Sequence, residues 1–169
     1  MYARPDKESH LDTVWYEIEM LDYCRQRIVQ YWEKWKQPHR NVYLEDFLLH
    51  YRSLLEVFGC NHYRQGDLII SNARDWTGRD LEASELASMR DPAYALDGKY
   101  YDEISKYLQH CTERRVEKKD WKAEEMYHEL GNVLSKFKQL FPRQAVPPPT
   151  STADVSTATI IGPTKIFDT

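Results

Sequence analysis

The sequence of 169 residues lacks the features that define several classes of protein. It has only three cysteines and no Cys-x-x-Cys pair, which argues against both a disulfide framework and a zinc site. These cysteines indicate reduced thiols in a cytoplasmic protein, with Cys24 and Cys111 as small core residues. No run of about 18 apolar residues occurs, so no membrane-spanning segment is predicted. The polar N-terminus, MYARPDKESH, also lacks the apolar region of a secretory signal.

Glycine motifs and excess positive charge are absent as well. The six glycines are scattered, and no Walker loop, Gly-x-Gly-x-x-Gly or Gly-x-Ser-x-Gly motif occurs. We therefore expect no nucleotide-cradling loop, no serine nucleophile and no cofactor. The net charge of -4 argues against sequence-independent coating of nucleic acid, because proteins that do this usually have a basic domain.

What the sequence does contain is a strong helical periodicity, with five tryptophans and twelve tyrosines among its apolar residues. Apolar residues recur at three- and four-residue steps, which predicts amphipathic helices. We predict one helix from Ser9 to Lys36, ended by Pro38, and a second from Asn41 to Phe58 with Gly59 as its C-terminal cap. The expected core of the second helix is Leu44, Phe47, Leu48, Tyr51, Leu54, Leu55 and Phe58.

The second half of the chain predicts three more helices. A short one covers residues 80–89 and is closed by Pro92, and a long one begins after Asp97 and Gly98. The last follows Asp120 as its N-cap. Its expected core is Met126, Leu130, Val133, Leu134, Phe137, Leu140 and Phe141. These patterns predict an all-α fold, an antiparallel up-and-down bundle of four long helices plus a short helix in the 60–96 connection.

The chain divides into two parts. Residues 1–141 form the predicted bundle domain, and within its long connection Leu68–Ile70 is expected to cover an open end of the bundle. Residues 142–169 are rich in proline, serine and threonine and predict a tail that is disordered or docks on a partner chain. Within this tail, TIIGPTKIF is apolar, and we expect it to lie in a groove of its own or a neighbouring chain.

One candidate site lies in the stretch YLQHCTERRVEKK, residues 107–119. His110 precedes Arg114 by one helical turn, so an imidazole could act as general base while a guanidinium holds a phosphate. The alternative is a boundary histidine that bonds a carboxylate of another helix. The basic run from Arg114 to Lys119 is equally explained as a solvated helix end with i,i+4 ion pairs.

The second predicted helix carries two further candidates. Asp46 and His50 share one side, and an aspartate–histidine pair can orient an imidazole for acid–base work. Arg52 and Glu56 share another side, where an ordinary i,i+4 ion pair is the alternative. If this helix faces the one that carries His110, then His50, Arg52, His110 and Arg114 meet in one catalytic site.

A metal site has only partial support. Glu125 and His128 form one Glu-x-x-His motif, whereas di-iron bundles require two such motifs and two further glutamates. Glu17, Glu19 and Glu45 are available as carboxylates, but the second motif is missing. We therefore predict no metal.

Two stretches resemble a known superfamily. NVYLEDFLLHYRSLLEVFG, from Asn41 to Gly59, and ISKYLQHCTERR, from Ile104 to Arg115, resemble small bacterial helical-bundle proteins similar to the HEPN superfamily. The resemblance covers residues 9–141. It implies an up-and-down bundle, often dimeric, and many HEPN proteins cleave RNA without a metal through an arginine followed by a histidine at a site built across a dimer.

The two stretches depart from that arginine–histidine order. Here His110 precedes Arg114 and His50 precedes Arg52. This departure favours a similarity to those HEPN members that are inactive and serve as binding or regulatory modules. We therefore predict a non-catalytic interaction module of a bacterial cytosol, a homodimer with a protein partner. The alternative is a metal-independent ribonuclease of a toxin or defence system, for which RNA is the partner.

Overall fold

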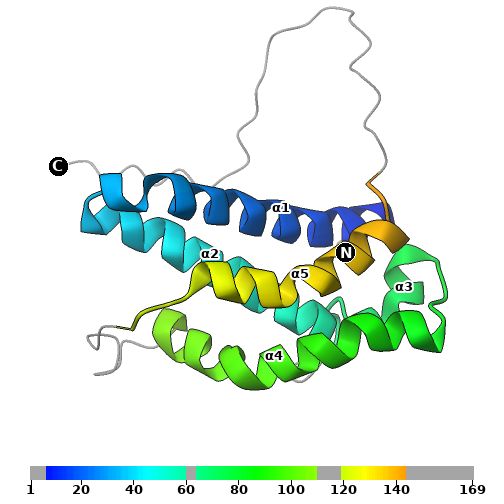
Figure 1. Cartoon of the computed structure of the whole chain (residues 1–169). Helices are drawn as coiled ribbons and strands as arrows, with labels where there is room; N and C mark the ends of the chain where they lie inside the picture. The colour runs from blue at the N-terminus through cyan, green and yellow to red at the C-terminus, as the bar shows by residue number, and fades with distance from the viewer. Residues whose placement is uncertain (1–6, 60–63, 110–118, 144–169) are drawn as a thin grey trace, which may run out of the picture.

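The structure is a computed structural model that describes residues 7–59, 64–109 and 119–143. Within these ranges the chain is helical and contains no strand (Figure 1). The α-helices are α1 (Lys7–Tyr31), α2 (Gln37–Gly59), α3 (Ala73–Thr77), α4 (Ala83–Gln109) and α5 (Ala123–Leu140). Two short 3₁₀ turns, η1 (Trp32–Lys34) and η2 (Ile70–Asn72), follow α1 and precede α3. The predicted all-α fold is confirmed.

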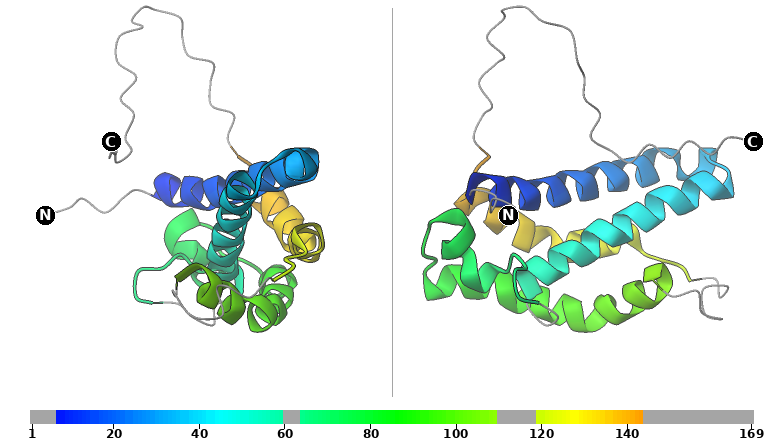
Figure 2. Two further views of the ribbon diagram at one scale, coloured as in Figure 1. Left: turned by 90° about the vertical axis from the view of Figure 1, so that its left-hand side faces the viewer. Right: turned by 180° about the vertical axis from the view of Figure 1, so that it is seen from behind.

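The four long helices run up and down in alternation. Figure 1 shows α1 and α4 running one way while α2 and α5 return, and Figure 2 shows the same packing end-on and from behind. Helix α2 packs against α1 and α4, and α5 packs against α4 and α1. The short α3 lies against the start of α1 and closes that end of the bundle. None of the described helices is both long and apolar enough to cross a lipid bilayer.

The core is formed by the apolar stripe of each helix. Every predicted core residue of α2 is buried, and so is every one in the α5 region except the half-buried Leu140. Cys24 is buried as expected, and burial raises the pKa of its thiol to about 11. Burying one large apolar side chain, such as a leucine or a phenylalanine, contributes about 1.5–3 kcal/mol to the stability of the fold. Burial of the apolar stripes therefore accounts for the association of the helices.

The boundary between α1 and α2 differs from the prediction. Helix α1 ends at Tyr31 instead of Lys36, and α2 begins at Gln37, so Pro38 lies in the first turn of α2. A proline is tolerated there because the first backbone N–H groups of a helix have no intrahelical partner. Pro38 therefore belongs to the start of the second helix and does not end the first, which stops at Tyr31.

The larger error concerns α4. The sequence predicts a short helix ended at Pro92 and a new helix after Gly98, but one helix runs from Ala83 to Gln109. Its buried stripe continues across the proline through Met89, Ala93, Leu96 and Ile104, while Pro92 itself is exposed. Packing of this stripe against α2 outweighs the local cost of the proline. The short helix of the connection is instead α3, at Ala73–Thr77.

The segment before α3 covers the end of the bundle as predicted. Ile69 and Ile70 are buried, and the indole Nε1 of Trp76 donates a hydrogen bond of 3.0 Å to the backbone oxygen of Ile69. Helix α3 ends at Gly78, whose φ of 78° is a left-handed conformation that glycine adopts without a steric penalty.

Candidate functional site

His50 is a buried member of a pair that links two helices. Its Nδ1 lies 2.8 Å from Oε2 of Glu17 on α1, and the ionised carboxylate can only accept the proton of that nitrogen. The ring of Tyr16 meets the imidazole edge-on, with ring centroids 5.8 Å apart. A carboxylate that orients an imidazole is an arrangement used in acid–base catalysis. However, His50 is only 7% exposed, which leaves little of it for a substrate to reach.

Arg52 belongs to a separate cluster on another side of α2. Its Nη2 lies 2.8 Å from Oε1 of Glu56, and the hydroxyl of Tyr101 on α4 donates to the same carboxylate oxygen at 2.8 Å. The guanidinium lies over the Tyr101 ring at 5.0 Å from its centroid. Burial raises the pKa of the Tyr101 hydroxyl, and its bond to Glu56 adds to that rise. The predicted i,i+4 ion pair is thus confirmed, with Tyr101 as an additional partner.

The two halves of the candidate site face different neighbours. His50 turns toward α1 and Arg52 toward α4, because residues two apart on a helix point about 200° apart around its axis. His110 and Arg114 lie outside the described residues, so the fourfold cluster stays a prediction. Within the described chain, His50 and Arg52 each have a partner that neutralises or orients them.

Two of these partners were not identified from the sequence. The i,i+4 spacing favours Asp46 as the partner of His50, whereas the structure supplies Glu17 from 33 residues away. Tyr101 is not among the residues predicted for the site, but its hydroxyl donates to Glu56 in the Arg52 cluster. Periodicity alone carries no signal for either contact, since both join helices that are distant in the sequence.

The Glu-x-x-His motif does not gain further ligands in the structure. Glu125 and His128 are exposed on α5. Among residues 7–59, 64–109 and 119–143, no three histidine, cysteine or acidic side chains are grouped closely enough to hold a metal ion.

A set of polar contacts joins α1 to α5. Arg25 binds Glu124 through two parallel hydrogen bonds of 2.6 and 3.0 Å, and its guanidinium lies 4.5 Å from the Tyr127 ring centroid. The Tyr127 hydroxyl donates to Asp22. Burial raises the pKa of this hydroxyl to about 12, and the bond to Asp22 adds to the rise. These contacts fix the angle between the two helices.

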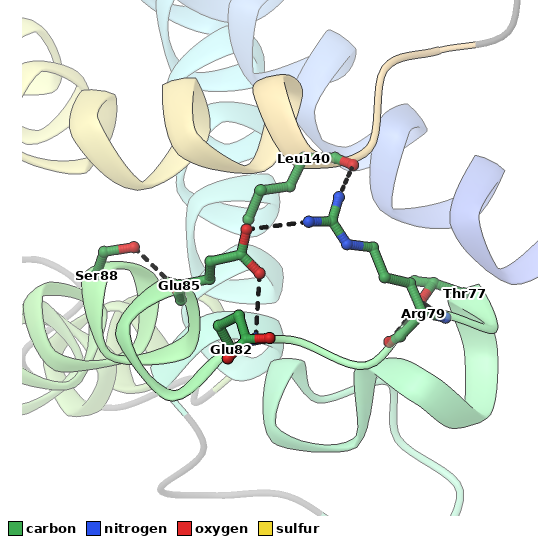
Figure 3. Close-up of polar contacts among 6 residues, drawn as sticks. All are labelled: Thr77, Arg79, Glu82, Glu85, Ser88 and Leu140. Carbon is green, nitrogen blue, oxygen red and sulfur yellow. Dashed lines mark hydrogen bonds and ion pairs between the residues drawn. The ribbon is translucent and has the colours of Figure 1, made fainter.

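A second polar cluster binds the C-terminal end of α5 (Figure 3). Arg79 donates a hydrogen bond of 2.9 Å to the backbone oxygen of Leu140 and forms a 3.0 Å ion pair with Glu85. Glu85 in turn accepts the backbone N–H of Glu82 at 3.1 Å, which is half of a capping box at the start of α4. A cation at a helix C-terminus also suits the helix dipole. This cluster therefore holds α3, α4 and α5 together.

Aromatic rings gather where α1 turns into α2. Trp35 stacks on Tyr43 with ring centroids 4.4 Å apart and on Tyr31 at 5.5 Å. The Arg27 guanidinium lies 4.9 Å from the ring centroid of Tyr23. Several of the tyrosines that make this sequence unusual are therefore used to close the α1–α2 turn.

The outer face of the α1–α2 hairpin carries exposed apolar side chains. Tyr16 and Tyr23 are seven residues apart on α1, and Val42 and Leu49 are seven apart on α2. Each of the four is between 41% and 54% exposed. Seven residues make about two helical turns, so each pair shares one side of its helix. We call these four residues the hairpin face.

Comparison with known proteins gives no relative: no family description, no curated protein and no solved structure matches this chain.

Proposed function

We propose that this chain is a non-catalytic, HEPN-like interaction module of a bacterial cytosol that acts as a homodimer with a protein partner. The main support is the pairing of the candidate catalytic side chains. His50 is buried against Glu17, and Arg52 is held by Glu56 and Tyr101 on a different side of α2. A catalytic pair would need both groups to converge on one accessible point.

The hairpin face supports an interaction role. Apolar side chains that stay exposed together on two adjacent helices are typical of surfaces that bind another protein. Tyr16 and Leu49 belong to the two helices that also share the His50–Glu17 pair, so the surface rests on a rigid support. We assign the homodimer contact to this face.

Analytical ultracentrifugation of the full chain tests the dimer. The wild type is expected to sediment as a dimer and the Leu49→Glu variant as a monomer, since a buried charge in the contact is costly. Tyr94→Glu is the matched control, because Tyr94 is a 57% exposed aromatic residue on α4, outside the hairpin face. It should leave the dimer intact. A monomeric wild type would remove the homodimer from the proposal.

Cleavage assays test the absence of catalysis. Wild type and His110→Ala are incubated with labelled tRNA and mRNA pools in EDTA, and no cleavage by either protein is expected. RNA cleavage by the wild type that is lost in His110→Ala, with unchanged helical content by circular dichroism, would instead establish the metal-independent ribonuclease.

A further inference from the structure

A pocket of about 360 Å³ opens where α1 ends and α2 and α5 begin. Its apolar lining comes from Ile28, Trp32, Leu44 and Trp121. Pockets that are mostly apolar with a few polar groups at defined positions are typical of binding sites for apolar ligands. The pocket lies at the end of α5 opposite to the Arg79 cluster, and it uses none of the candidate catalytic residues.

The rim of the pocket carries three carboxylates, Asp120, Glu124 and Glu125, and one cation, Lys122. Glu124 is bound by Arg25 and Asp120 by Lys122. Glu125 also lines the pocket and is exposed, with Lys122 as a neighbouring charge that is itself bound to Asp120. A ligand with a positive charge beside its apolar part would find a counter-ion there.

Trp121 is a largely buried part of the pocket lining. The residue is 9% exposed, and its Nε1 has no hydrogen-bond partner within the described chain. An indole N–H is only a donor, and leaving a buried donor unpaired is unfavourable. The apolar lining together with the Glu125 carboxylate is complementary to an apolar peptide that contains one cation.

We propose that the pocket binds the C-terminal segment of this same chain, residues 159–167, TIIGPTKIF. Its isoleucines and phenylalanine match the apolar lining. Lys165 is the only lysine or arginine after Arg143, and it stands next to Ile166 and Phe167. The segment thus carries one cation beside its apolar side chains, and this cation can pair with the Glu125 carboxylate.

The length of the intervening chain permits this arrangement. The pocket lies at the start of α5, and the described chain ends at Arg143, just beyond the other end of that helix. A helix of this length spans about 27 Å. The 16 residues from 144 to 159 can span up to about 50 Å when extended, and about 20–24 Å as a flexible coil. The segment therefore reaches back along α5 to the pocket without strain.

The indole N–H resonances of the full chain in a ¹H–¹⁵N spectrum test the proposal. The Trp121 resonance is assigned with Trp121→Phe and the Trp32 resonance with Trp32→Phe. The double variant Ile166→Ser/Phe167→Ser should shift both resonances relative to the wild type. Trp15 and Trp76 serve as internal controls, since their Nε1 groups donate to Phe141 and Ile69 far from the pocket. Their resonances should not move.

A charge exchange tests the assigned pairing. Glu125→Lys should shift the Trp121 resonance as the tail variant does, and Glu125→Lys combined with Lys165→Glu should restore it. Asp102→Lys is the control, because Asp102 is an exposed carboxylate on α4 that does not line the pocket.

Three outcomes would overturn the proposal. One is identical Trp121 resonances in the wild type and the Ile166→Ser/Phe167→Ser variant. Another is a Trp121 resonance that stays at the Glu125→Lys position when Lys165→Glu is added. The third is a Trp121 resonance that reverts to the variant position on dilution of the wild type, which would assign the bound segment to a second copy.

Discussion

Gly59 at the end of α2 lies directly against Asp97 in the middle of α4. A Cβ atom added to Gly59 would come 3.1 Å from Cβ of Asp97 and 3.2 Å from the backbone oxygen of Ala93. A glycine at position 59 lets two helices approach closely, whereas the sequence predicts that it caps a helix. The buried Asp97 likewise lies inside a continuous helix where a turn was expected.

Substitution of glycine should therefore have opposite effects at two positions. Gly59→Ala should lower the free energy of unfolding by about 1–3 kcal/mol, because the added methyl group forces α2 and α4 apart. Gly98→Ala should raise it by about 0.5–1 kcal/mol, since an alanine there favours the helix. A Cβ on Gly98 meets no atom within 4 Å. Urea unfolding followed by circular dichroism measures both, and equal effects would contradict the close crossing.

Replacing Pro92 with alanine should stabilise the protein. It lies exposed in the interior of α4, where it removes one backbone hydrogen bond. Pro92→Ala should raise the free energy of unfolding by about 1–3 kcal/mol, which thermal unfolding can measure. Pro38→Ala is the matched control and should change stability little, as Pro38 lies in the first turn of α2. A loss of stability in Pro92→Ala would mean that α4 needs the proline.

The Arg79 cluster should contribute to stability more than an exposed ion pair does. Arg79→Ala removes the hydrogen bond to Leu140 and the pair with Glu85, and we expect a loss of about 1 kcal/mol in urea unfolding. Arg74→Ala removes only the 3.5 Å pair with Asp80, in which both side chains are 73% exposed. That variant should unfold like the wild type.

The His50–Glu17 pair should behave as a structural contact. Glu17→Ala leaves a buried imidazole nitrogen without its acceptor, and the free energy of unfolding should fall by about 1–3 kcal/mol. Catalytic groups are often held at a cost to stability, so an unchanged or increased stability in Glu17→Ala would argue for a catalytic role instead. Chemical unfolding of both proteins at one pH decides between them.

Stability should fall in acid partly through Glu129. Burial opposes the shift, but hydrogen bonds from Lys99 and Tyr100 lower the pKa of this carboxyl below its usual value of 4.5. A lowered pKa in the folded state gives stabilisation that is present above pH 4.5 and lost as the pH falls through the folded pKa. Glu129→Gln should therefore show a shallower loss of stability below pH 4.5 in unfolding curves. An unchanged slope would exclude this contribution.

The helical stripes follow from the order of residues along the chain alone. The predicted core residues of α2 are all buried, as are those of the α5 region except the half-buried Leu140, because helical periodicity is a local property that follows from 3.6 residues per turn. Four long amphipathic helices with short connections then made an antiparallel bundle the expected arrangement. Around the candidate site, the Arg52–Glu56 pair was predicted, but neither Glu17 nor Tyr101 was assigned as a partner, and the catalytic site itself stays a prediction.

The remaining features depend on how the helices pack against one another. Local signals at Pro92 and at Asp97–Gly98 favoured a break, and packing of the stripe from Met89 to Ile104 against α2 overrode them. The partner of His50 comes from 33 residues away, and the pocket at Trp121 combines side chains from α1, α2 and the start of α5. Such contacts depend on how whole helices lie against one another. Because that arrangement minimises the free energy of the entire chain, no short stretch of sequence is enough to predict the contacts.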